Sequence, residues 1–78
     1  MKTISIKAAA QGWMLRSDAI ATEQFFSSGA SAESAAIRLA QGLADAGENS
    51  SIEIHLRDGS LGRRFVVPAL PARPSVTN

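Results

Sequence analysis

Alternation of hydrophobic and polar residues dominates the first third of the chain. A period of two is typical of strands that bury one face and expose the other. The alternation covers three segments and is weakest in the last of them: residues 2–7, 13–16 and 21–26. Turn-forming residues separate the segments, with Gln11-Gly12 before the second and Ser17-Asp18 before the third. The sequence therefore predicts a three-stranded meander.

A helical period replaces this alternation after residue 31. Small apolar residues, mostly alanine, recur at helical spacing between polar ones from 32 to 46. Ser31 has the residue type of an N-cap, Glu33 would place a carboxylate in the first turn, and Gly47 would cap the C-terminus. Because its apolar stripe is rich in alanine, the predicted helix can lie close to a sheet.

The clearest alternation of the chain follows at residues 52–57, and a fifth predicted strand covers 61–67. Asp58-Gly59 between them is a strong hairpin signal, for which we expect a type I′ turn with positive φ at both residues. Gly62 is interpreted as a bulge or as a residue that gives access to the neighbouring strand. The predicted fold is α+β: an antiparallel sheet of about five strands, in the order βββαββ, with one helix packed on one face.

The length and the tail define the domain organisation. Seventy-eight residues with 45% hydrophobic content suffice for one domain, which we place at residues 1–67. The segment 68–78 contains all three prolines and no periodicity, and is predicted to be disordered or loosely extended. Residues 67–73 fit the proline-rich pattern that docks in aromatic grooves, but we interpret them as a plain tail.

Composition limits the chemistry further. The chain has no cysteine and a single histidine, His55, so disulfides and thiolate metal sites are excluded, and no metal or cofactor is expected. No apolar run has the length of a signal peptide or of a membrane span, which predicts a cytoplasmic protein without membrane contact. The net charge of +1 lacks the basic excess of a dedicated DNA-binding domain.

The residues that catalysis would need are scattered. His55 alternates with Ile54 and Leu56, so its side chain is predicted to point away from the core, and no serine lies in a strained turn of the nucleophile-elbow kind. The carboxylates fall on different predicted elements, without the apolar surroundings that a general acid requires. We therefore expect no enzymatic activity.

Three short motifs resemble a known family. Gly12-Trp13 lies in an early strand, Ser-Ala-Glu-Ser-Ala-Ala opens the helix at 31–36, and Ile-His-Leu-Arg-Asp-Gly at 54–59 ends an apolar strand. Over roughly residues 4–67 this pattern resembles the bacterial domain-of-unknown-function family 2188. The chain departs from it at 6–8, where the family tends to have a valine-rich strand ending in proline, and in its long helix-to-strand loop. The resemblance implies no activity, because the family has none agreed.

A second resemblance is to the HicB-type antitoxins, in which strands also precede a helix that opens with a threonine and acidic residues. Here Phe26, a small-residue loop and Ala-Glu-Ser-Ala-Ala at 32–36 carry it. The Gly-Asp-Thr expected before that helix is missing, and the hairpin at Asp58-Gly59 does not belong to the pattern. This resemblance implies an antitoxin-like accessory protein, and we rank it second.

The sheet face opposite the helix is the candidate binding surface. If the strands turn their hydrophobic residues toward the helix, Trp13 and Leu56 included, alternation collects a different set on the opposite face. This predicted set, with Glu53 and one phenylalanine beside it, is Lys7, Met14, Arg16, His55, Arg57, Arg64 and Val66. Such a face is either solvated, packed against a second copy, or bound to the phosphates of a nucleic acid.

From these patterns we expect a small non-enzymatic binding or assembly module that self-associates through the helix-free face as a homodimer. A nucleic-acid-binding or antitoxin-like accessory protein is the alternative.

Overall fold

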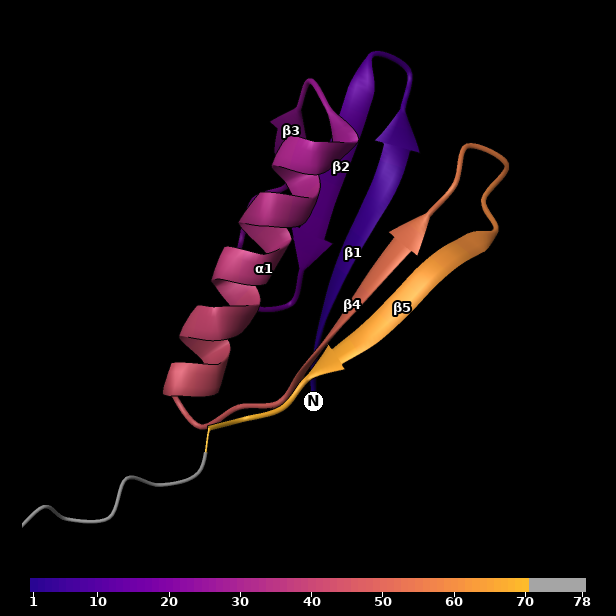
Figure 1. Cartoon of the computed structure of the whole chain (residues 1–78). Helices are drawn as coiled ribbons and strands as arrows, with labels where there is room; N and C mark the ends of the chain where they lie inside the picture. Colours follow the sequence, from indigo (N-terminus) through magenta and orange to yellow (C-terminus); the bar gives the residue numbers. More distant parts are fainter. Residues whose placement is uncertain (71–78) are drawn as a thin grey trace, which may run out of the picture.

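The structure is a computed structural model and describes residues 1–70. Its elements follow the predicted order, with one helix on one face of a five-stranded sheet (Figure 1). They are β1 (Lys2–Ala9), β2 (Gly12–Ser17), β3 (Gln24–Phe26), α1 (Gly29–Asp45), β4 (Ser50–His55) and β5 (Leu61–Val67). The α+β class and the single helix are thus confirmed for the described residues.

The strand order is β3-β2-β1-β4-β5, which makes β1 the central strand. The other neighbouring strands are antiparallel, but β1 and β4 run parallel, from Lys2 beside Ser50 to Lys7 beside His55. The prediction of a purely antiparallel sheet was therefore wrong. Because α1 runs back along the sheet, the chain re-enters it at the end where β1 began, and β4 fills the free edge of β1 in the same direction.

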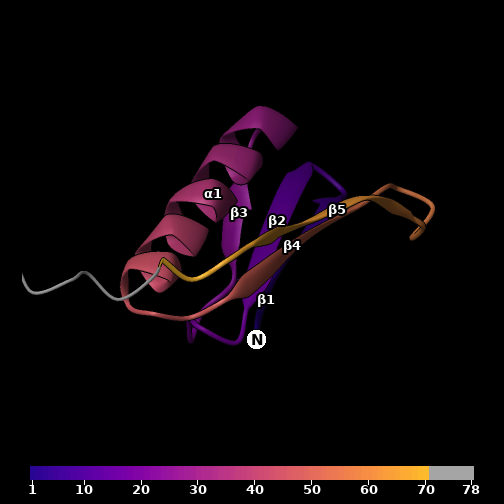
Figure 2. The same cartoon turned by 60° about the horizontal axis from the view of Figure 1, so that its bottom comes forward.

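The core lies between α1 and the facing side of the sheet. Four alanines spaced four residues apart form the buried stripe of the helix: Ala32, Ala36, Ala40 and Ala44. The first three of them pack over the buried side chains of the three central strands: Ile4, Ile6, Leu15 and Ile52. Trp13 packs against this cluster as a core residue, as predicted. Figure 2 shows the helix on one side of the sheet only, which within residues 1–70 leaves the opposite side open.

The helix begins one turn earlier than predicted. Ser28, not Ser31, is the N-cap: its backbone is extended and its Oγ accepts a hydrogen bond from the Ser31 N–H at 3.1 Å. Glu33 consequently lies beyond the first turn, which contains no acidic residue. The run of small residues offers several possible caps, and Gly29 is favoured inside the helix because a Cβ there would crowd the ring of Trp13.

The helix ends as predicted, at a left-handed Gly47 with φ of 86°. The Glu48 N–H donates to the Leu43 carbonyl at 2.8 Å and the Gly47 N–H donates to the Ala44 carbonyl at 3.0 Å. These are the two hydrogen bonds of a Schellman motif, which satisfies carbonyls that the helix itself leaves without partners.

The β4–β5 connection differs from the predicted turn. Only Gly59 has positive φ, so Asp58-Gly59 is not a type I′ turn; instead the Gly59 N–H donates to the Leu56 carbonyl at 2.9 Å. The N–H and hydroxyl of Ser60 donate to the Asp58 carboxylate and hold the pKa of that group below its usual value. Because β4 ends at His55, Leu56 lies in the turn with 48% of its surface exposed, not in the core as predicted.

Gly62 is confirmed as a bulge residue, because the register shifts between Ile54 opposite Arg63 and His55 opposite Leu61. Of the predicted tail, residues 71–78 lie outside the described part of the chain. Before them, the Ala69 N–H donates to Asn49 Oδ1 at 2.7 Å.

Candidate interaction surface

The central strand β1 defines two faces of the sheet. Ile4 and Ile6 are buried under the helix, so Thr3, Ser5 and Lys7 project from the opposite side. We call this opposite, helix-free side the outer face. Because β2 and β4 are in register with β1, every second residue of these strands joins it there.

A line of alternating charge crosses the outer face through Ser5. In the register, Ser5 lies beside Arg16 on β2 and beside Glu53 on β4, and Glu53 lies opposite Arg64 on β5. Just before β3, Glu23 extends the line, with its Oε2 3.4 Å from Nε of Arg16. We call this line the charged row; from the β3 edge to the β5 edge it reads Glu23, Arg16, Ser5, Glu53 and Arg64.

Both arginines of the charged row are paired within the chain. Arg16 contacts Glu23, and Nε of Arg64 lies 3.5 Å from Oε2 of Glu53. The Nε of Arg64 also donates to the Ser51 hydroxyl at 3.2 Å. The arginine side chain thus lies over Ser51, which is buried. These pairs orient the arginine side chains along the face and offset their charge.

A second row, toward the turns that follow β1 and β4, combines apolar and basic side chains. In register order from β3 to β5 it contains Phe25, Met14, Lys7, His55 and Leu61. We call it the mixed row. Its two ends are apolar and open to solvent: Phe25 is 70% exposed and Leu61 is 51% exposed. Exposed apolar side chains of this size among charged ones are typical of protein contact surfaces.

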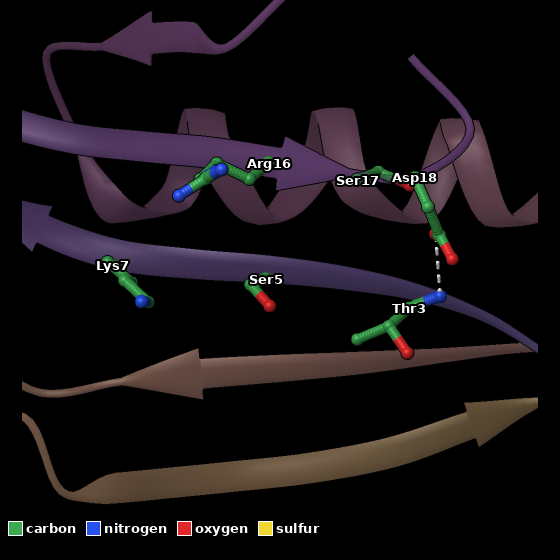
Figure 3. A pocket seen from close by; sticks show the side chains of 6 residues that line it. All are labelled: Thr3, Ser5, Lys7, Arg16, Ser17 and Asp18. Atoms are coloured by element: carbon green, nitrogen blue, oxygen red, sulfur yellow. Dashed lines mark hydrogen bonds between the residues drawn. The ribbon is translucent and has the colours of Figure 1, made fainter. Parts of the chain in front are cut away.

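A shallow hollow of about 390 Å³ lies on β1 and β2, where small side chains leave room (Figure 3). Lys7 and Arg16 stand at one end of it, and Asp18 accepts a hydrogen bond from the Thr3 N–H at 3.1 Å at the other. Ser5 lies between the two ends. The hollow therefore has a basic end and an acidic end.

The structure brings most of the predicted site residues together. The six that share the outer face are Lys7, Met14, Arg16, His55, Arg64 and Val66. Arg57 does not belong to a strand as predicted: since β4 ends at His55, Arg57 lies in the turn, and its Nη1 donates to the Ala9 carbonyl at 3.3 Å. Sequence reasoning also missed Leu61, whose position depends on the bulge at Gly62, and Glu23, whose contact depends on the β2–β3 register.

The charge of the outer face is balanced rather than basic. Its lysine and two arginines share the surface with Asp18, Glu23 and Glu53. Opposite charges at short range offset one another, so the face lacks the uncompensated positive charge that attracts a phosphate backbone. Glu53 was expected on this face, whereas Asp18 and Glu23 are acidic residues that the predicted set does not include.

His55 belongs to this charge network. Its Nε2 lies 3.6 Å from Oε1 of Glu53, the carboxylate that also contacts Arg64. Within residues 1–70 the hydrogen bonds include none between His55 and a serine hydroxyl, and no three acidic or histidine side chains are grouped closely enough to hold a metal ion. The one helix of the described chain is too short and too polar to cross a membrane.

No protein-family model, curated protein or solved structure matches the chain. The resemblances to family 2188 and to the HicB-type antitoxins therefore stay predictions.

Proposed function

We propose that this chain is a small, non-enzymatic assembly module that pairs with a second copy of itself through the outer face. The observation that carries the proposal is the composition of that face: exposed Phe25 and Leu61 flank side chains whose charges balance. A face whose charges balance and whose edges are apolar costs less free energy to desolvate against a protein surface than a face with charges of a single sign.

The small core adds a reason for association. Single cores of chains this short typically leave about 3–5 kcal/mol of net stability. The helix contributes mainly alanine methyl groups to this core. A partner that binds only the folded state stabilises it by mass action. Covering the outer face would thus supply burial that the helix cannot provide.

A nucleic-acid-binding role is the alternative. Lys7 favours it, because within residues 1–70 its ammonium group forms no ion pair and it borders the hollow. Against it, Phe25 is the aromatic side chain open for base stacking on the outer face, whereas sheet-based RNA readers present two or three.

The first test is the substitution Phe25→Glu. Phe25 is largely exposed, so the variant is expected to fold, while the new charge would be buried in the proposed contact. Light scattering coupled to size exclusion should give twice the 8.2 kDa chain mass for the wild type and the single-chain mass for the variant. Ile37→Glu, on the exposed side of the helix, is the matched control and should leave the dimer intact.

A wild type that stays monomeric up to about millimolar concentration, the range of the weakest specific complexes, would contradict the assembly proposal. Salt-sensitive binding of an RNA oligonucleotide by that monomer, weakened by Lys7→Glu, would instead support the alternative.

A further inference from the structure

We propose that the two copies are related by a twofold axis that lies between their outer faces and runs parallel to β1. This inference rests on the proposed function, because it takes the outer face as the contact between copies. It adds the symmetry of the contact and the residues that meet across it.

The order of charges in the charged row points to this axis. From the β3 edge to the β5 edge the signs are negative, positive, neutral, negative and positive, with Ser5 of the central strand in the middle. The row is therefore antisymmetric about β1: each charge has the opposite sign at the same distance on the other side.

A rotation by 180° about an axis along β1 exchanges the two edges of the sheet. It leaves each row at the same position along the strand direction, so a row lies over the same row of the second copy. Arg16 then lies over the partner's Glu53, and Glu23 lies over the partner's Arg64. Symmetry repeats both contacts, so four attractive contacts form and no charge of the row faces its own sign. Each arginine keeps its glutamate within the chain and gains a second one across the interface.

The competing face-to-face arrangement has its twofold axis along the charged row, across the strands. Each residue of the row would then lie over its own copy, with Arg16 on the partner's Arg16 and Glu53 on the partner's Glu53. Like charges brought together in a contact are unfavourable and typically exclude an arrangement. The same five residues thus favour one axis and oppose the other.

The mixed row is compatible with the axis along β1. Because β3 comes to lie over the β5 of the second copy, the exposed ring of Phe25 meets the partner's exposed Leu61. The strands of the two sheets remain roughly aligned, as in face-to-face sheet packing, where the sheets lie about 10 Å apart. The apolar ends of the mixed row are covered in both copies in this arrangement.

Lys7 is the exception, because it lies on β1 and meets its own copy at the axis. The hollow beside it, over Ser5 and Thr3, gives its flexible side chain room to turn aside. Removing the charge would remove the repulsion between the two copies of Lys7. We therefore expect Lys7→Gln to lower the dissociation constant of the dimer roughly threefold at low salt. Dilution series in the analytical ultracentrifuge measure this constant, and a weaker Lys7→Gln dimer would contradict the axis.

Two double variants with matched charge changes test the charged row. Arg16→Glu with Glu53→Arg breaks the pairs within the chain but keeps opposite charges facing across the axis, so its dissociation constant should stay within about threefold of the wild type. Arg16→Glu with Glu23→Arg preserves a pair within the chain but makes every charge of the row face its own sign. Its dimer should weaken roughly tenfold or more at low salt.

A cross-linking measurement keeps the inference testable if either double variant misfolds. The chain contains no cysteine, so single cysteines can be introduced cleanly. With the axis along β1, Lys7→Cys lies beside its own copy and a short bismaleimide should link the two chains, whereas Arg64→Cys lies at the edge and should not be linked. The axis along the row predicts the reverse.

The possible failures are distinguishable. A dimer that weakens equally in both double variants, or that is linked through Arg64→Cys, would overturn the axis and leave the assembly proposal standing. A wild type that remains monomeric would overturn both.

Discussion

Replacing Gly12 with alanine should destabilise the fold more than adding a single methyl group at any other position of this chain. Gly12 has φ of 142°, a conformation that residues with a Cβ rarely adopt, and an added Cβ would clash with the Phe26 carbonyl oxygen of the neighbouring strand. Strain of this kind costs about 1–3 kcal/mol before the clash is counted. We expect a loss of about 2–4 kcal/mol in the free energy of unfolding.

Urea denaturation followed through the fluorescence of Trp13, the single tryptophan, measures this loss. Gly42→Ala is the matched control, since Gly42 is helical and a Cβ there meets nothing within 4 Å. Alanine is the better helix former, so this variant should gain about 0.5–1 kcal/mol. Equal unfolding midpoints for the two variants would show that the Gly12 backbone conformation is not required.

Replacing Ile4 with alanine should have an effect of similar size for a different reason. Ile4 is fully buried on the central strand, where it packs between Ile52 in the neighbouring strand and the alanine stripe of α1. The stripe has no long side chains that can fill the space, so a cavity remains. Isoleucine-to-alanine changes in such positions typically cost about 2–5 kcal/mol, which is comparable with the whole stability of about 3–5 kcal/mol expected for a domain of this length.

Ile37→Ala makes the same chemical change on the exposed side of α1 and serves as the control. It should alter the free energy of unfolding by no more than about 0.5 kcal/mol. If both isoleucine variants unfold at the same urea concentration, the packing described here between β1 and α1 is incorrect.

Alternation alone was enough to predict which face of β1, β2 and β4 is buried. Ile4, Leu15 and Ile52 lie under the helix as expected, because a period of two permits only two assignments and the hydrophobic side selects one. The C-terminal cap at Gly47 and the bulge at Gly62 were predicted for the same kind of local reason. Each depends on the conformational range of a single residue and its immediate neighbours.

The features that were not predicted depend on the arrangement of whole elements. The parallel pairing of β1 with β4 follows from the direction of the helix, which the pattern of the strands does not contain. The charged row needs both the strand order and the register, because Arg16 and Glu53 are far apart in the sequence and lie on either side of Ser5 only in the folded sheet. The turn position of Arg57 depends on where β4 ends.

The two neighbours of the central strand, β2 and β4, also differ in the length of chain that must be closed before they can pair with β1. On one side β1 pairs with β2 through a tight connection at 10–11, while on the other Lys2 pairs with Ser50, and β2, β3 and the helix lie between these two residues in the sequence. Closing the longer loop costs more chain entropy, and proteins that depend on such distant pairings fold more slowly. The edge of β1 therefore stays open until β4 arrives, so the docking of the β4–β5 hairpin, rather than helix formation, should limit the rate at which this domain completes its sheet.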